Sequence, residues 1–150
     1  MLLYFSPINT RISSNHAARN KPDTKTRDGE TMIKVKSIFA PHSHDDGFRV
    51  LLEPVWPRKA SRGKNLVNVW LRDLAPSQGL YNLYTGNMIP WEGFIARYHE
   101  ELNMNRDYFP DLQRHNDNGG LTLVHGSISE ERNIAVALKR LLEKDHALLT

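Results

Sequence analysis

A cluster of cations beside a tryptophan is the first group of residues whose types and spacing could do chemistry. Four positive charges lie within seven residues, at Arg58, Lys59, Arg62 and Lys64. Trp56 precedes them closely, and a guanidinium next to an indole can bind a phosphate, a carboxylate or a nucleotide base. The alternative interpretation is a solvated basic loop with Trp56 buried in the core.

His125, Gly126 and Ser127 form a second candidate site, between a predicted strand and the predicted last helix. In open parallel sheets ligands bind outside the carboxyl ends of the strands, and a helix N-terminus offers N–H groups to an anion. His125 can accept or donate a proton near neutral pH. Glu53, which ends another predicted strand, is the second candidate for acid–base chemistry. A capping turn is the alternative, and the Gly-x-Ser-x-Gly frame of serine hydrolases is absent.

The loop from His42 to Asp46 contains two histidines and two aspartates, a combination that can bind a metal ion. These are neighbouring ligands with no distant partner, so a polar turn is the favoured interpretation and no metal site is predicted. The chain contains no cysteine, which excludes disulfides, thiolate nucleophiles and iron–sulfur clusters. It also lacks a P-loop, a Gly-x-Gly-x-x-Gly motif and a His-Glu-x-x-His motif, so no cofactor is expected.

Composition and charge limit the classes of function. The chain has 150 residues, of which 39% are hydrophobic and 25% are charged, and this length is typical of one domain. Residues 1–31 hold five basic and three acidic residues, whereas residues 32–150 hold 15 basic and 14 acidic residues. A nearly neutral domain argues against a general polyanion binder. No apolar window reaches the ~18–20 residues of a membrane helix, so we expect a cytoplasmic protein without a membrane partner.

Residues 1–31 show no helical or strand periodicity after their apolar start and are mostly polar. Such a segment buries too little apolar surface to offset the entropy lost on ordering. We interpret it as a disordered extension or a mis-assigned start, since Met32 directly precedes the first predicted strand. The folded domain is predicted to span residues 32–150.

The spacing of apolar residues predicts the elements that position these sites. It predicts three strands, at residues 33–39, 48–52 and 121–124. It predicts helices at residues 66–74, 77–84, 91–102, 108–114 and 129–144. Ser77 is the expected N-cap of the second helix, and Ser127-x-x-Glu130 has the form of a capping box before the last one. Together these elements predict an α/β fold: a small, mainly parallel β-sheet of about three strands with helices packed on it.

Several separated segments, in order along the chain, carry a family resemblance. They are residues 46–58 (DGFRVLLEPVWPR), residues 70–77 (WLRDLAPS), Trp91 with Phe94 and Tyr98, and residues 122–124 (TLV). Together they resemble the YeaO-like proteins, a bacterial and archaeal family of unknown function, over about residues 32–143. The resemblance implies a soluble α/β protein.

The chain departs from the family pattern around both candidate sites. Pro54 stands where the family usually has an arginine, and Lys59 where it has a glycine. Near the start of the last helix, Ile128 and Ile134 lie where charged and imidazole groups are usual, although Asn133 is retained. If the family's polar cluster is catalytic, these replacements put its chemistry in doubt. Whether this chain is an enzyme is therefore left open.

The favoured hypothesis is a protein that binds an anionic small molecule, such as a phosphate, carboxylate or nucleotide, at the C-terminal edge of the sheet. The ligand would lie between the loop after the second strand and the turn before the last helix. The predicted ligand-binding residues are Arg49, Trp56, Arg58, Ser127 and Asn133. Arg58 is the first expected contact, and Asn133, one turn into the helix, is the second. His125 is the proton carrier expected in this crevice.

Two alternatives stay open. A nucleic-acid-associated or transcription-regulatory protein would place Arg72 and the cations of residues 58–64 on one basic face. Members of the resembled family often carry a MarR-type regulator label, but no helix-turn-helix with a winged hairpin is visible in this chain. A non-catalytic interaction domain would use the matching residues mainly to hold the fold.

Overall fold

The computed structural model describes residues 32–61 and 66–149. Within these residues one sheet contains four parallel strands, β1 (Lys34–Ser37), β2 (Phe48–Leu51), β3 (Val69–Trp70) and β4 (Leu121–His125). The strand order is β1-β4-β2-β3, and Val50 lies opposite both Leu123 of β4 and Val69 of β3. The predicted α/β fold with a small parallel sheet is therefore confirmed. The prediction for residues 1–31 lies outside the described residues.

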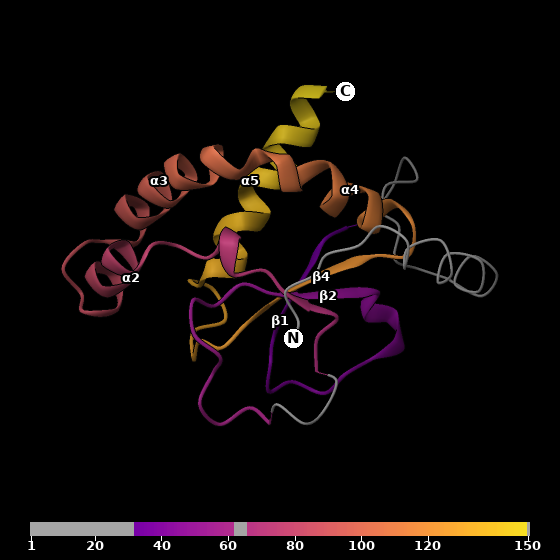
Figure 1. Ribbon diagram of the computed structural model, residues 1–150, viewed down its shortest axis with the longest axis horizontal. Coiled ribbons are helices and arrows are strands. Elements are labelled where there is room, and N and C mark those ends of the chain that lie inside the picture. Colours follow the sequence, from indigo (N-terminus) through magenta and orange to yellow (C-terminus); the bar gives the residue numbers. More distant parts are fainter. Residues whose placement is uncertain (1–31, 62–65, 150) are drawn as a thin grey trace.

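The helices of the described residues are α2 (Gln78–Thr85), α3 (Trp91–Leu102), α4 (Phe109–Asp117) and α5 (Ile134–Leu149) (Figure 1). The described residues also form three 3-10 turns, η2 (His44–Asp46), η3 (Arg72–Leu74) and η4 (Asn103–Tyr108). The bounds of α3 are those predicted from its apolar spacing. Ser77 caps α2 as predicted, because its Oγ accepts the N–H of Leu80 at 3.2 Å. None of the helices in the described ranges has the length and apolar character needed to cross a membrane.

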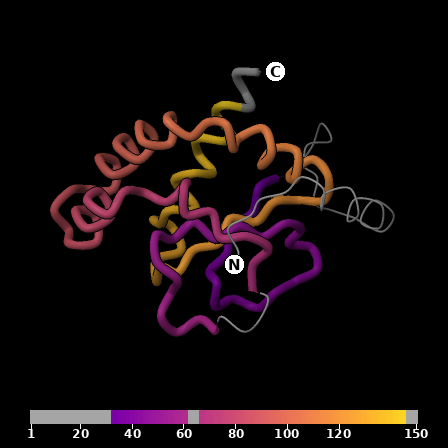
Figure 2. The backbone as a smooth tube through the Cα atoms, in the orientation of Figure 1, coloured from indigo at the N-terminus to yellow at the C-terminus, as the bar shows by residue number. Residues whose placement is uncertain are grey.

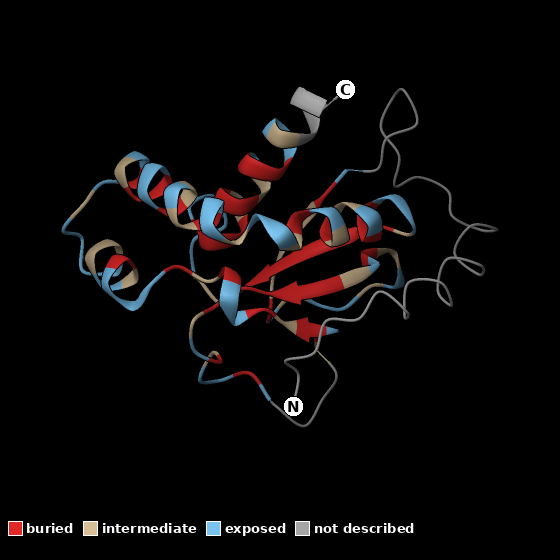
Figure 3. Ribbon diagram, turned by 45° about the horizontal axis from the view of Figure 1, so that its top comes forward, coloured by how far each residue is buried: buried red, intermediate tan, exposed pale blue. Residues whose placement is uncertain are grey.

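Alternate residues of the strands enter two different cores. Val50 and Leu123 point to one face of the sheet, where they join a large cluster with apolar residues of α2, α3, α4 and α5. Leu51 and Val124 point to the other face, where they pack with Trp56 from the segment between β2 and β3. The helices lie together on one side of the sheet, and this connecting segment lies on the other (Figure 2 and Figure 3). Both faces are thus covered, and the edge at the carboxyl ends of the strands is left to form sites.

The helix predicted at residues 66–74 is wrong, because this segment forms β3 and η3. β3 pairs with β2, and the N–H of Leu71 donates to the carbonyl of Leu51 at 2.9 Å. The apolar spacing of so short a segment fits a helix or a strand, and the β-branched Val67 and Val69 favour the strand. Pairing with a strand that is distant in the sequence decides between the two.

The last helix also begins later than predicted, at Ile134. Asn133 caps it, since its Oδ1 accepts the N–H of Val136 at 3.0 Å and its carbonyl accepts the N–H of Ala137 at 3.1 Å. The predicted Ser127-x-x-Glu130 capping box is therefore wrong, because residues 126–133 form a loop. Asn133 precedes the helix instead of lying one turn into it.

Candidate functional site

Arg49, a predicted ligand contact, lies inside the protein and is 1% exposed. Its Nη1 donates to Asp46 Oδ2 at 2.7 Å and its Nε to the carbonyl of Leu66 at 2.6 Å. Lys36 Nζ lies 3.1 Å from the same carboxylate. Burial alone would raise the pKa of Asp46, but hydrogen bonds from the Ser43 N–H, Lys36 and Arg49 outweigh it and lower that pKa. Arg49 therefore serves a buried ion-pair network at the start of β2.

The same network accounts for the loop from His42 to Asp46. The turn from Ser43 to Asp46 is closed by Ser43, whose N–H donates to Asp46 Oδ2 at 3.1 Å and whose Oγ accepts the N–H of Asp45 at 3.2 Å. His42 and His44 are exposed. In the described part of the chain, no group of three or more histidine or acidic side chains is arranged to hold a metal ion.

Glu53 lies just beyond the end of β2 and is buried. Its Oε2 accepts the N–H of Gly126 at 2.9 Å, and its Oε1 accepts the hydroxyl of Tyr81 at 3.2 Å. Burial raises the pKa of Glu53, and the two hydrogen bonds offset only part of this effect. One of the protein's own carboxylates thus binds the first N–H after β4, at the turn where an external anion was expected.

The loop after β2 also packs directly on the turn after β4. A Cβ atom added to Gly126 would lie 2.8 Å from Pro57 Cγ and 3.1 Å from Pro57 Cβ. Only a glycine allows this close approach without displacing the proline. The two loops are therefore in contact at Gly126, where the sequence predicts a crevice.

His125 is fully buried at the end of β4. Its Nδ1 accepts the N–H of Ser127 at 3.0 Å, and its Nε2 has no hydrogen-bond partner in the described residues. The strand alternation places His125 on the same face as Leu121 and Leu123, which belong to the core under the helices. Because the imidazole of His125 is buried away from solvent, its pKa is lowered, and the ring is neutral at neutral pH.

The remaining predicted site residues range from buried to exposed, with Ser127 half-buried. Trp56 is buried and donates its indole N–H to the carbonyl of Ala60 at 3.0 Å. Ser127 Oγ accepts the N–H of Ser129 at 3.1 Å, and Asn133 is the helix cap already described. Arg58 and Lys59 are exposed, whereas Arg62 and Lys64 lie outside the described residues. No hydrogen bond or ion pair within the described ranges joins Arg58 to Arg49, Glu53 or Asn133.

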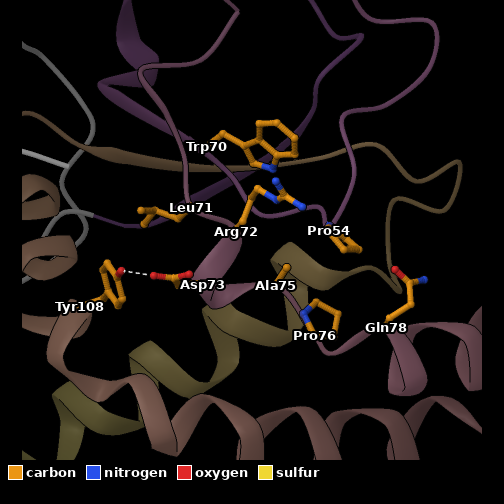
Figure 4. Close-up of a pocket in the computed structure, with 9 residues that line it drawn as sticks. All are labelled: Pro54, Trp70, Leu71, Arg72, Asp73, Ala75, Pro76, Gln78 and Tyr108. Atoms are coloured by element: carbon orange, nitrogen blue, oxygen red, sulfur yellow. Dashed lines mark hydrogen bonds between the residues drawn. The ribbon is translucent and has the colours of Figure 1, made fainter. Parts of the chain in front are cut away.

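A cavity of about 540 Å³ opens at a different part of the carboxyl edge, beyond the ends of β2 and β3 (Figure 4). Its lining comes from the chain after β2, from β3 and η3, from the start of α2 and from the end of η4. The lining residues are Pro54, Trp70, Leu71, Arg72, Asp73, Ala75, Pro76, Gln78 and Tyr108. Arg58 is not among them. Pro54, one of the departures from the YeaO-like pattern, forms part of the wall.

Two charged side chains line this cavity and point in different directions. The guanidinium of Arg72 lies 5.0 Å from the ring centre of Trp70, whose indole N–H is fixed by the carbonyl of Glu53 at 2.7 Å. Asp73 Oδ2 accepts the hydroxyl of Tyr108 at 2.6 Å, and this hydrogen bond raises the pKa of Tyr108. Figure 4 shows Arg72 directed toward Pro54 and Asp73 directed toward Tyr108.

The described residues leave the guanidinium of Arg72 without an ion pair or a hydrogen bond. A guanidinium over an aromatic ring presents its N–H edge to a planar oxygen group such as a carboxylate or a phosphate. Asp73 and Tyr108 form a hydrogen-bonded pair in the same lining, and Gln78 adds a neutral amide. The cavity can therefore hold a small polar ligand.

A family model described as "Inactive DUF488-N3 subclade" matches residues 32–148. The chain belongs to this family, DUF488-N3i. Uncharacterised proteins of Mycobacterium bovis and Mycobacterium tuberculosis are 29% identical to it over 113 residues, which cover 75% of this chain and 95% of each relative. No solved structure matches the chain. The YeaO-like proteins are a family of the DUF488 type, so the predicted family resemblance is confirmed.

Sequence reasoning missed the cavity of this DUF488-N3i domain because it placed Arg72 and Asp73 in a helix. The sequence pattern assigns Arg72 only to the basic face of the nucleic-acid alternative. It predicts no site role for Asp73, Gln78 or Tyr108, which also line the cavity. The sequence does contain a signal for a strand that ends in a turn. The β-branched Val69 favours a strand, and Pro76, two residues after Leu74, is typical of a turn. A polar pair that follows a parallel strand lies at the carboxyl edge of the sheet.

Proposed function

We propose that this DUF488-N3i protein binds a small molecule with an anionic group in the cavity beyond β3, and that it does so without catalysing a reaction. The observation that carries the proposal is the guanidinium of Arg72. It lines a cavity at the carboxyl edge of a parallel sheet, lies over Trp70 and has no acidic partner in residues 32–61 and 66–149. A volume of about 540 Å³ is within the range of small-molecule sites.

The chemistry of the wall favours an anion over an apolar ligand. A guanidinium forms paired, charge-assisted hydrogen bonds with carboxylates and phosphates, and its contact with an indole fixes the orientation of its edge. The indole of Trp70 is itself held by its hydrogen bond to the Glu53 carbonyl. The binding group is therefore supported by the sheet, which reduces the entropy lost when a ligand is bound.

The absence of catalysis is proposed from the positions of the two acid–base candidates. Glu53 and His125 are buried, each accepts a backbone N–H, and neither is among the residues that line the cavity. Tyr108 does line it, but its pKa is raised, so its hydroxyl keeps its proton at neutral pH. The description of the family as an inactive subclade supports the same conclusion.

Thermal unfolding at low salt tests this proposal. Inorganic phosphate and acetate should raise the Tm of the wild-type protein, and Arg72→Gln should abolish the rise because the anion contact is lost. Arg58→Gln is the matched control, since it removes the same charge from an exposed residue outside the cavity lining. An unchanged rise in Arg72→Gln, or its loss in Arg58→Gln, would contradict the proposal and favour the loop after β2. No rise in the wild-type protein would exclude both sites.

A further inference from the structure

We infer that the ligand of this cavity is zwitterionic, with a carboxylate or other anionic group at one end and a protonated amine at the other. Free amino acids, amino acids with longer spacers and short peptides with free termini belong to this class. The inference rests on the proposed function, because it assumes that Arg72 binds the anionic group.

The described lining of the cavity carries two ionised side chains of opposite sign, Arg72 and Asp73. They are neighbours in η3, yet no ion pair within 4.0 Å joins them in the described residues. Arg72 is directed toward the wall formed by Trp70 and Pro54, whereas Asp73 is directed toward Tyr108 (Figure 4). Each charge is therefore available to a different end of one ligand.

Asp73 retains capacity for a ligand after its contacts within the protein are counted. Its Oδ2 accepts the hydroxyl of Tyr108, and its backbone carbonyl accepts the side-chain amide of Asn105 at 3.0 Å. Its Oδ1 accepts no hydrogen bond from the described residues. An ionised carboxylate accepts several hydrogen bonds, so a ligand ammonium can donate to Asp73 while Tyr108 stays in place.

Opposite charges in one cavity disfavour ligands that carry a single sign of charge. A phosphate dianion gains from Arg72 but is also repelled by Asp73 in the same cavity, so it should bind Arg72 more weakly than a zwitterion does. A simple amine gains from Asp73 and is repelled by Arg72. A zwitterion gains from both contacts. The same lining includes apolar side chains that can pack on an apolar spacer, and the residues that supply them are Pro54, Trp70, Leu71 and Pro76.

Isothermal titration calorimetry with paired probes tests this inference. The probes are glycine, β-alanine, 4-aminobutyrate and Ala-Ala, each compared with its N-acetyl derivative, which keeps the carboxylate and loses the ammonium. At least one free probe should bind the wild-type protein about tenfold or more tightly than its acetylated partner. Arg72→Gln should weaken both members of the pair, whereas Asp73→Asn should remove the difference between them.

Two further variants separate selectivity from a loss of structure. Asp107→Asn removes a charge from an exposed residue of η4 outside the cavity lining, so it should keep the preference for the free amine. Glu100→Gln removes a charge from an exposed residue of α3 outside the same lining, and it should keep the preference as well. If acetylated probes or phosphate bind as tightly as the free probes, in an Arg72-dependent way, the inference is wrong and the proposed function stands. If neither kind of probe binds, both are wrong.

Discussion

The carboxyl edge of the sheet contains two polar regions that differ in what their charged groups contact. Between β2 and β4, Glu53 accepts the N–H of Gly126 and the loops pack against each other. Beyond β3, Arg72 and Asp73 line a cavity of about 540 Å³. The closed region contains the two acid–base candidates of the sequence, Glu53 and His125. Both accept backbone N–H groups of the turn after β4. The open region holds charges that the described fold does not neutralise.

Two arginines make this difference concrete. Arg49 is surrounded by the protein and pairs with Asp46, whereas Arg72 is exposed and pairs with no carboxylate in the described residues. A buried charge that loses its partner costs far more than an exposed one, because the remaining charge has no water to solvate it. The same substitution should therefore lower stability at Arg49 and weaken ligand binding at Arg72.

Arg49→Met is expected to have the largest effect on stability. It leaves the Asp46 carboxylate buried with Lys36 as its charged partner, and loss of a buried partner typically costs about 3–5 kcal/mol. Arg72→Met should change the free energy of unfolding by less than about 0.5 kcal/mol, since it alters a surface residue. Urea unfolding of the two variants measures both values. Similar, small losses in both would show that Arg49 is not a structural residue and would return it to the list of ligand contacts.

The residues that could be predicted from the sequence are those whose structure depends on near neighbours. The apolar spacing from Trp91 to Leu102 gave the bounds of α3, and Ser77 gave the start of α2. Both signals lie within one or a few helical turns, so they do not depend on the rest of the fold.

The features that escaped prediction depend on contacts between distant residues. β3 exists because Val69 pairs with Val50, and the closed region exists because Glu53 meets Tyr81 and Gly126, 28 and 73 positions away. No local pattern encodes those distances. For this reason the sequence predicts a site at the carboxyl edge of the sheet but does not indicate that the loops packed around Gly126 differ there from the cavity beyond β3.

Gly126→Ala tests how tightly the closed region is packed. The added methyl would overlap Pro57, and such overpacking typically costs about 1–3 kcal/mol. Gly79→Ala is the control, because no atom lies within 4 Å of its added Cβ and α2 should gain up to about 1 kcal/mol from the alanine. Urea unfolding should therefore give changes of opposite sign. A neutral Gly126→Ala would mean that the two loops are separated in solution and that the crevice between them is accessible.

Glu53→Gln should have the smallest effect at any single pH, and it tests the closed region through its pH dependence. Burial raises the pKa of Glu53 above its ordinary value of 4.5, so the folded protein keeps this proton at a pH where the unfolded chain has lost it. Because the folded state then binds more protons, the free energy of unfolding falls as the pH rises from about 4.5 through the folded pKa. Glutamine removes this titration but keeps an oxygen for the N–H of Gly126. The stability of the wild type minus that of Glu53→Gln, measured by urea unfolding from pH 4 to pH 8, should therefore decrease as the pH rises. Asp46, whose pKa is lowered, titrates in both proteins and cancels in the difference. A difference that stays constant with pH would mean that water reaches Glu53, and that the closed region is open to ligands as the cavity beyond β3 is. A difference that increases with pH would mean that the hydrogen bonds from Gly126 and Tyr81 outweigh burial and lower the pKa of Glu53.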